Sequence, residues 1–268
     1  MNRLMHASIS FRVGERKLMA MGLGNYEVTM LNFDGPYLMQ PRLRSHAHRW
    51  VELGDIPGTN LLCAEEALME IRRRLPAGRG RGITFIGSGN YHYVTLLLLE
   101  KIDRPFALVL FDRHSDMQGG HGGLGLLSCG NWVALAMDRL PMLREVHIVG
   151  ADHEEAAEMP GTGNGIRFWP ADTRPEDLAS ALEGRDVYIS IDKDVLNRES
   201  AVTNWDQGEM PLGRLRELLR AVTRRARVIG VDVCGECPAK SADLWRWTLA
   251  HHRNETANLA ILDALESA

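Results

Sequence analysis

The feature that most constrains the fold is an alternation of short apolar runs with longer stretches of helical periodicity. The apolar runs are nearly continuous and rich in β-branched residues, which favours strands that are covered on both faces. They are Val28–Phe33, Ile83–Ile86, Phe106–Phe111, Val146–Val149, Val187–Ile191 and Val228–Val233. The helical patterns are Leu61–Leu75, Tyr93–Ile102, Trp132–Leu140, Pro211–Val222 and Asn254–Leu265. This alternation predicts βαβ units, and therefore an α/β fold of three layers (αβα) with a mostly parallel central sheet.

The composition predicts one globular domain that spans residues 1–268. Hydrophobic residues make up 45% of the chain and charged residues 25%, which is the usual balance of a soluble domain. No internal repeat, low-complexity tract or long linker divides the sequence. The 31 basic and 35 acidic residues give a net charge of −4, and this slight acidity argues against a nucleic-acid partner.

The cysteine content and the apolar runs predict a compartment. Four cysteines are too few for a disulfide scaffold in a chain of this length. The first residues lack the apolar stretch of a signal peptide, and no apolar run is long enough to span a membrane. We therefore expect a cytoplasmic protein with reduced thiols and no membrane partner.

Polar residues that are suited to metal binding follow three of the predicted strands. They are Asp112, His114 and Asp116 after Phe106–Phe111, Asp192 and Asp194 after Val187–Ile191, and His92 after Ile83–Ile86. Residues two apart in an extended chain turn their side chains the same way. Ligands of α/β sheets bind beyond the carboxyl ends of the strands, so we expect these side chains to share one crevice.

The number of acidic groups in this crevice is the argument for metal. Carboxylates that are packed closely repel one another unless cations neutralise them. Divalent metals accept mixed carboxylate and imidazole ligands, and two ions about 3.5–4 Å apart would serve the whole set. A single Asp after a strand is more often a helix cap or a turn residue. The presence of all three groups at strand ends is what predicts a metal site.

Two of these segments resemble motifs of the ureohydrolases, the family of arginase, agmatinase and formimidoylglutamase. Residues 111–116, Phe-Asp-Arg-His-Ser-Asp, are similar to the family's Asp-Ala-His-x-Asp motif. Residues 190–196, Ser-Ile-Asp-Lys-Asp-Val-Leu, are similar to its Ser-x-Asp-x-Asp motif. The segment Gly89-Asn90-Tyr91-His92 stands where the family has Gly-Gly-Asp-His. The resemblance runs from about residue 83 to the C-terminus and implies an arginase-like fold.

The resemblance also implies a binuclear metal centre in which every ligand position is filled. One Mn²⁺ would be held by His92, Asp112, Asp116 and Asp192, and the other by His114, Asp112, Asp192 and Asp194. Asp112 and Asp192 would bridge the two ions. Ni, Co, Fe and Zn stay open, because this ligand set accepts several first-row metals. Histone-deacetylase-like relatives of the same fold keep only a single-metal subset, so the full set favours the two-metal branch. Homo-oligomers are common in the family, and we expect one here.

One departure from the family concerns its proton-shuttling histidine. In the segment 128–132, Ser-Cys-Gly-Asn-Trp, Cys129 occupies that position. Cys129 is predicted to shape the substrate pocket, with inert packing, a metal-proximal role and a nucleophilic role as the alternatives. His121, in a glycine-rich loop, is a candidate replacement acid, and an exposed loop residue is the alternative interpretation.

A second departure concerns the glutamate that grips the guanidinium group. The family's Asp-x-x-Glu-x-Asn-Pro motif aligns with residues 232–238, so that Gly235 stands at the Glu position and Glu236 comes one residue late. In an extended chain a slip of one residue turns a side chain to the opposite face. Glu236 is a candidate catalytic residue if the backbone bulges there; otherwise the pocket lacks this carboxylate. Cys234 and Cys237 are interpreted as ordinary thiols beside the crevice rather than as a redox pair or a zinc site.

The candidate substrate-binding residues are Asn90, Asn131, Trp205 and Asp206. Trp205 is interpreted as a pocket wall or as a lid over the core, and Asp206 matches the end of a family loop. His153 and Glu155 lie where arginase-like enzymes recognise the amino-acid end of a substrate, but solvation at the surface is the favoured interpretation.

The sequence thus predicts a two-metal hydrolase that cleaves a linear C–N bond in a small guanidine, amidine or amide by means of a metal-activated hydroxide. The alternatives are a non-catalytic metal-binding or regulatory protein on the same fold and a deacetylase-like amidohydrolase.

Overall fold

The computed structural model describes residues 26–77, 82–118, 126–151, 165–238 and 244–266. Its centre is an eight-stranded sheet in which every pair of neighbouring strands is parallel. In spatial order the strands are β2 (Arg49–Glu52), β1 (Glu27–Asn32), β4 (Gly82–Phe85), β10 (Arg227–Cys234), β9 (Asp186–Asp192), β5 (Phe106–Phe111), β7 (Leu143–Val149) and β8 (Ile166–Trp169).

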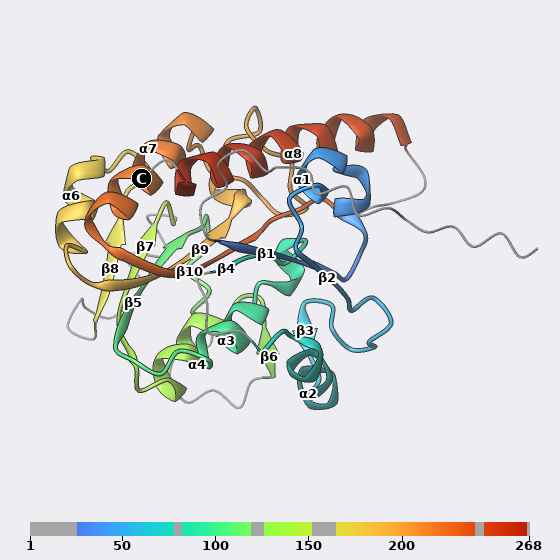
Figure 1. Cartoon of the computed structure of the whole chain (residues 1–268), viewed down its shortest axis with the longest axis horizontal. Helices are drawn as coiled ribbons and strands as arrows, with labels where there is room; N and C mark the ends of the chain where they lie inside the picture. Colours follow the sequence, from blue (N-terminus) through green and yellow to red (C-terminus); the bar gives the residue numbers. More distant parts are fainter. Residues whose placement is uncertain (1–25, 78–81, 119–125, 152–164, 239–243, 267–268) are drawn as a thin grey trace, which may run out of the picture.

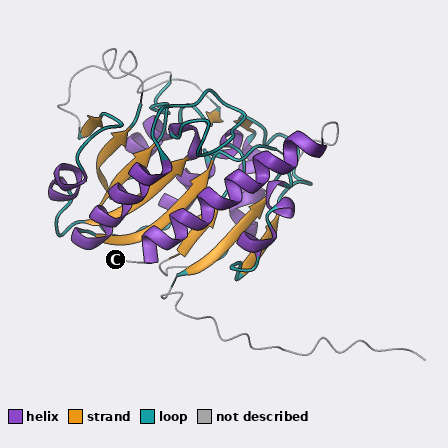
Figure 2. Cartoon of the chain, turned by 90° about the horizontal axis from the view of Figure 1, so that it is seen from above, coloured by secondary structure: helices purple, strands orange, loops and turns teal. Residues whose placement is uncertain are grey.

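Helices cover both faces of this sheet (Figures 1 and 2). One face carries α1 (Pro41–Arg44), α6 (Pro175–Ala181), α7 (Leu212–Arg225) and α8 (Leu244–Glu266); the other carries α2 (Glu65–Arg74), α3 (Val94–Leu99) and α4 (Trp132–Arg139). Strand β5 contributes Val109 and Phe111 to the first core and Leu108 and Leu110 to the second, because successive side chains leave a strand on opposite faces. The prediction of a three-layer αβα fold with a parallel sheet is confirmed.

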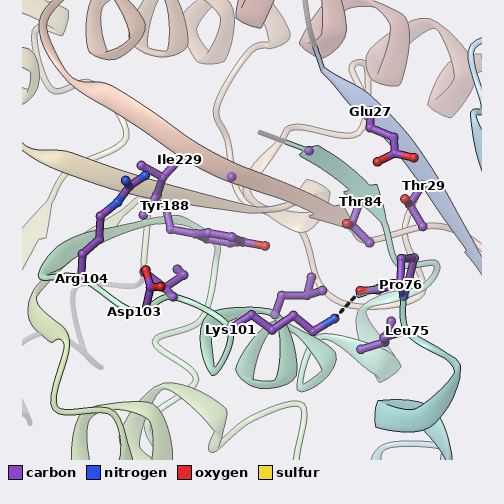
Figure 3. A pocket seen from close by; sticks show the side chains of 14 residues that line it. Glu27, Thr29, Leu75, Pro76, Thr84, Lys101, Asp103, Arg104, Tyr188 and Ile229 are labelled. Atoms are coloured by element: carbon purple, nitrogen blue, oxygen red, sulfur yellow. Dashed lines mark hydrogen bonds between the residues drawn. The ribbon is translucent and has the colours of Figure 1, made fainter. Parts of the chain in front are cut away.

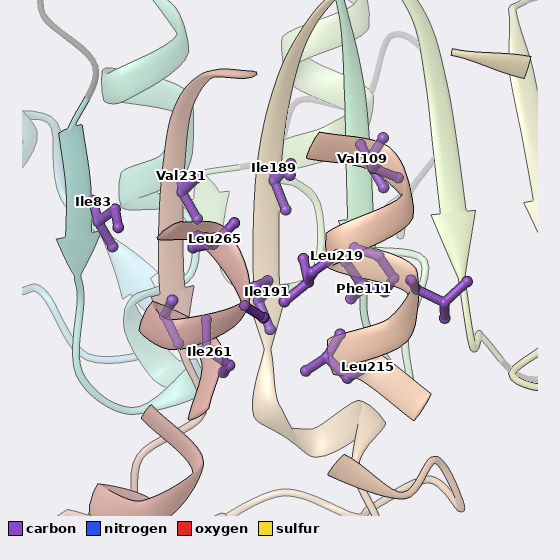
Figure 4. Close-up of a cluster of buried hydrophobic side chains, with 14 of the residues drawn as sticks. Ile83, Val109, Phe111, Ile189, Ile191, Leu215, Leu219, Val231, Ile261 and Leu265 are labelled. Carbon is purple, nitrogen blue, oxygen red and sulfur yellow. The ribbon is translucent and has the colours of Figure 1, made fainter. Parts of the chain in front are cut away.

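Figure 4 shows how the first of these cores is built. Leu215 and Leu219 of α7 and Ile261 of α8 lie against Ile189 and Ile191 of β9, and all five side chains are fully buried. Strand β9 carries the predicted ligand Asp192 at its carboxyl end, so the packing of α7 and α8 holds that end in place.

All six predicted strands are present, but the two edge strands were missed. Strands β2 and β8 are four residues long, and each carries charged as well as apolar side chains, as in Ile166-Arg167-Phe168-Trp169. Charged side chains are common on edge strands, where they discourage pairing with other chains, and they obscure the apolar signal.

Two helix predictions need correction. The helix predicted for Leu61–Leu75 begins only at Glu65, because Leu62–Cys63 (β3) pairs antiparallel with Leu127–Ser128 (β6). Leu61 cannot start a helix, since its φ is +66°. The last helix, predicted for Asn254–Leu265, begins at Leu244, ten residues earlier.

The strand order brings the predicted ligands together. Strands β4, β10, β9 and β5 are neighbours, and they are parallel, so their carboxyl ends meet at one edge of the sheet. β4 is followed by the 3₁₀ turn η2 (Gly89–Tyr91) and His92, and β9 by the 3₁₀ turn η4 (Lys193–Val195).

A buried polar cluster lies behind this edge, between the ends of β9 and β10 and helix α8. Lys193 and Glu236 form an ion pair in which both side chains are fully buried. The Glu236 carboxylate also accepts hydrogen bonds from Gln40 Nε2 (2.8 Å), Asn254 Nδ2 (3.0 Å) and Asn258 Nδ2 (2.7 Å). Asn258 Oδ1 in turn accepts from Lys193 Nζ (2.9 Å). The cluster therefore ties α8 and the segment before α1 to the turn that carries Asp192 and Asp194.

We expect the Lys193–Glu236 pair to behave as one unit. Lys193→Met and Glu236→Gln each leave a buried charge without its partner, and each is expected to lower the free energy of unfolding by about 3–5 kcal/mol. The double variant is expected to lose less than the sum of the two. Urea denaturation of the four proteins measures this coupling.

Arg72→Met is a suitable control, because Arg72 pairs with Glu100 at the surface, where about 0–1 kcal/mol is expected. Additive losses in the double variant would contradict the assignment of a coupled pair.

Candidate metal centre

The carboxyl ends of β4, β5 and β9 assemble two triads of metal-ligating side chains. His92, Asp112 and Asp116 form the first triad, and Asp112, His114 and Asp194 the second. Within each triad the ligand atoms lie within 4.8 Å of one another. Asp112 belongs to both, as a bridging ligand would.

The two oxygens of Asp112 face different histidines. Asp112 Oδ2 lies 3.3 Å from Nδ1 of His92, which is also 2.9 Å from Asp116 Oδ2 and 3.6 Å from Asp192 Oδ2. Asp112 Oδ1 lies 3.5 Å from Nδ1 of His114, which is 3.0 Å from Asp194 Oδ2. The structure thus brings all six predicted metal ligands into one cluster.

In both imidazole rings the nitrogen that faces away from the cluster, Nε2, contacts a polar side chain. Nε2 of His92 lies 2.9 Å from Ser190 Oγ, which donates to Asp232 Oδ1 (2.7 Å). Nε2 of His114 lies 3.1 Å from Asp206 Oδ1. Such outer contacts orient a metal-binding histidine, and here they leave Nδ1 of both rings directed at the carboxylates.

The electrostatics of the cluster fit divalent cations. Burial, with Asp116 close by, raises the pKa of Asp112, and burial with Asp194 close by raises that of Asp192. Burial and the nearby Asp112 raise the pKa of Asp194 to about 7. Asp112 Oδ2 is buried without a hydrogen-bond donor. Bound cations stabilise the charged form of carboxylates that are buried close to one another. The carboxylate and imidazole donors of this cluster therefore suit two divalent metal ions.

Cys234 adds a sulfur atom that the sequence interpretation had placed only beside the crevice. Its Sγ donates to Asp192 Oδ2 at 3.1 Å, and Cys234 forms a third potential metal-binding triad with His92 and Asp192. The signal in the sequence was its position at the end of β10, which lies between β4 and β9.

A cavity of about 320 Å³ opens onto the cluster. Its lining includes the ligands Asp112, His114, Asp116 and Asp192, together with Leu61, Leu62, Gln118, Ser128, Cys129, Gly130 and Trp205. Leu61, Leu62, Gln118 and Ser128 were not among the predicted substrate-side residues. The β3–β6 pairing brings Leu61 and Leu62 here, and such a long-range contact leaves no local pattern in the sequence.

Cys129 lies in the wall of this cavity, and its role in shaping the substrate pocket stays a prediction. Burial, with Asp116 close by, raises the pKa of its thiol to about 11. Without a bound cation the thiol is therefore protonated at neutral pH.

Four of the predicted catalytic and substrate-binding residues have other contacts. Glu236 does not reach the cavity, because its carboxylate is enclosed in the buried cluster with Lys193. Asn131 accepts a hydrogen bond from Ser128 N and donates to Leu126 O, so it shapes the loop. Asn90 Oδ1 accepts from Trp205 Nε1 (3.0 Å), and Asp206 positions His114.

Trp205 does line the cavity. His121, His153 and Glu155 lie outside the described residues.

A second cavity, of about 290 Å³, lies near the amino ends of the strands, where Thr84, Lys101 and Tyr188 line it (Figure 3). None of the proposed metal ligands borders it. Because ligands of parallel α/β sheets bind beyond the carboxyl ends of the strands, the cavity over the metal cluster is the candidate active site.

Solved structures that share this fold include ureohydrolases. The chain superimposes on an agmatine ureohydrolase of Thermoplasma volcanium with a TM-score of 0.64, at 15% identity and with 91% of this chain and 90% of that one covered. Proclavaminate amidino hydrolase from Streptomyces clavuligerus gives 0.62 at 17% identity (90% and 93% covered), and arginase from Bacillus caldovelox gives 0.62 at 13% (91% and 99%). The chain has the ureohydrolase fold, as its motifs predicted.

Among curated proteins, an uncharacterized protein of Thermotoga maritima is 33% identical over 238 residues, which are 89% of each chain. The chain belongs to the same family as that protein. No family model matches the sequence.

We expect Asp112→Asn to abolish binding of both metal ions, because Asp112 is the residue that the two triads share. Asp194→Asn is expected to remove one ion, since Asp194 belongs to a single triad. Metal analysis by plasma mass spectrometry after gel filtration measures the stoichiometry, with the surface variant Asp263→Asn as the control. Full metal content in Asp112→Asn would refute the bridging role.

Asp206→Asn is expected to lower the affinity for one of the two metal ions, the one beside His114, by about 10–100-fold, because the Asp206 carboxylate orients the His114 ring. The ion that faces His92 should be unaffected. Titration with a competing chelator, in which the release of each of the two bound ions is followed separately, measures the two affinities. Equal weakening of both ions, or of neither, would show that Asp206 does not act through His114.

Proposed function

We propose that the protein is a binuclear-metal-dependent hydrolase that cleaves a linear C–N bond in a small guanidine, amidine or amide. The observation that carries this proposal is the pair of triads that share Asp112 at the base of a cavity. The ureohydrolase fold supports it, because the cluster stands at the carboxyl edge of the sheet, where this class of fold binds ligands.

The ions would be held by the six clustered residues, His92, Asp112, His114, Asp116, Asp192 and Asp194. Two divalent ions in this set would lower the pKa of a water molecule and supply hydroxide near neutral pH.

Residues of the cavity wall are proposed to bind the substrate and to protonate the leaving nitrogen. Trp205 lines the cavity beside the proposed ligand His114. Gln118 and Ser128 offer hydrogen-bonding groups to a substrate. We propose Cys129 and His121 as the candidates for protonating the leaving nitrogen, Cys129 because its thiol lies in the cavity wall.

The identity of the metal, the cellular compartment and the oligomeric state are also proposed. Mn²⁺ is the implied metal, with Ni, Co, Fe and Zn as alternatives. None of Cys63, Cys129, Cys234 and Cys237, which all lie in the described part of the chain, forms a disulfide, which supports a reducing, cytoplasmic compartment. Within the described residues, no helix combines the length and the apolar character needed to cross a membrane. A small molecule is the proposed partner, and a homo-oligomer the proposed assembly.

Amide hydrolysis of the deacetylase-like kind is the second candidate function. Glu236 is turned away from the cavity, and Gly235 stands in its place. Among the described lining residues, the pocket therefore has no carboxylate to grip a guanidinium group apart from the metal ligands.

A product screen tests the proposal. The protein loaded with Mn²⁺, Co²⁺ or Zn²⁺ is incubated with guanidines, amidines and amides, and urea, ammonia and carboxylic acid are measured. We expect turnover of one class at a rate that Asp112→Asn lowers by at least about 10³-fold, because both ions are lost. A protein that binds two metal ions but turns over none of the classes would favour the non-catalytic alternative.

A further inference from the structure

We propose that the substrate of this site has an uncharged scissile group and an apolar chain, and that Leu61, Leu62 and Trp205 bind that chain. The inference rests on the proposed hydrolytic function and names the class of substrate: a neutral amide with an aliphatic or aromatic substituent.

The backbone at Gly235 is the first observation. Its φ is +79°, and a Cβ atom there would lie 2.4 Å from Asp192 Oδ1 and 2.5 Å from Lys193 N. No side chain fits at this position without displacing the proposed bridging ligand. The next residue, Glu236, is held in the opposite direction by Lys193, so this segment presents no carboxylate to the cavity.

The charge of the cavity is the second observation. Among the described residues that line it, the ionisable side chains are four proposed metal ligands and Cys129. Two divalent ions would balance the four carboxylates of the cluster, Asp112, Asp116, Asp192 and Asp194. The described lining residues then offer no further anion to pair with a cationic substrate. Asp206, beside the cavity, is engaged by His114 Nε2 at 3.1 Å. A cation that leaves water without a partner is costly.

The apolar wall is the third observation. Leu61, Leu62 and Trp205 line the cavity and yet are 39%, 52% and 37% exposed. Leu126, which precedes β6 in the same ribbon, is 59% exposed. Exposed apolar side chains that gather at the mouth of a cavity mark a binding surface.

The backbone of Leu61 is held in a strained conformation. A φ of +66° is strained for leucine, and such strain is typical of functional sites. Its carbonyl accepts a hydrogen bond from Cys129 N (3.0 Å), and the neighbouring Leu62 pairs with Ser128. The β3–β6 ribbon thus fixes the two leucines beside the cluster.

Trp205 is fixed against the ligands as well. Its Nε1 donates to Asn90 Oδ1 (3.0 Å), and its ring meets the edge of the His114 ring at 5.9 Å and 70°. A Cβ at Gly89 would lie 2.9 Å from both Trp205 Cδ1 and Asp192 Oδ2. The glycine lets the indole approach the proposed ligand, so an apolar chain on the indole lies directly beside the reacting group.

Hydroxamic acids test this inference, because they bind divalent metals whatever chain they carry. We compare acetohydroxamic acid, hexanohydroxamic acid and its 6-guanidino derivative by calorimetric titration of the metal-loaded protein. We expect hexanohydroxamic acid to bind at least about tenfold more tightly than acetohydroxamic acid, a difference that the burial of two or three methylene groups supplies. It is also expected to bind more tightly than the guanidino derivative, whose cation would lose water without a paired anion. Trp205→Ala and Leu62→Asp are expected to abolish that preference and to keep the metal content.

Leu38→Asp is the matched control: Leu38 is also 52% exposed but does not border the cavity, and the preference should persist. Tighter or equal binding of the guanidino compound would overturn the inference and leave the metal centre intact. The inference would also be overturned if Leu62→Asp kept the preference for hexanohydroxamic acid and changed the oligomeric state. That result would show that the leucines face another copy of the chain. Failure of every hydroxamate to bind the metal-loaded protein would overturn the proposed function itself.

Discussion

Repulsion between buried carboxylates is the constraint on which the rest of this structure depends. Asp112, Asp192 and Asp194 are almost fully buried at neighbouring strand ends, and burial raises the pKa of each. Parallel strands force this proximity, because their carboxyl ends share one edge of the sheet. Bound cations would relieve the repulsion, and His92 and His114 would complete two ligand sets around the shared Asp112.

The residues behind the cluster hold this arrangement and also keep Glu236 out of the cavity. Lys193 stands between two proposed ligands, and its pairing with Glu236 anchors the turn to α8. The same pairing withdraws Glu236 from the cavity and leaves Gly235 against Asp192. A single buried ion pair therefore connects the stability of the turn that carries Asp192 and Asp194 to the position of Glu236 outside the cavity.

The parts of the site that could be predicted from sequence are those that depend on local spacing. Asp112, His114 and Asp116 follow a continuous apolar strand, and the structure brings them together as the spacing indicated. The partners of Glu236 could not be predicted in this way, because Gln40 and Asn258 are separated by 218 residues. For the same reason the contact of Leu62 with Ser128 was missed, and the region was interpreted as helix.

The most direct test of the central claim is anomalous diffraction from crystals grown with Mn²⁺. The account predicts two peaks about 3.5–4 Å apart, one beside Nδ1 of His92 and the other beside Nδ1 of His114, with Asp112 between them. A single peak, or none at these nitrogens under saturating metal, would contradict a binuclear centre.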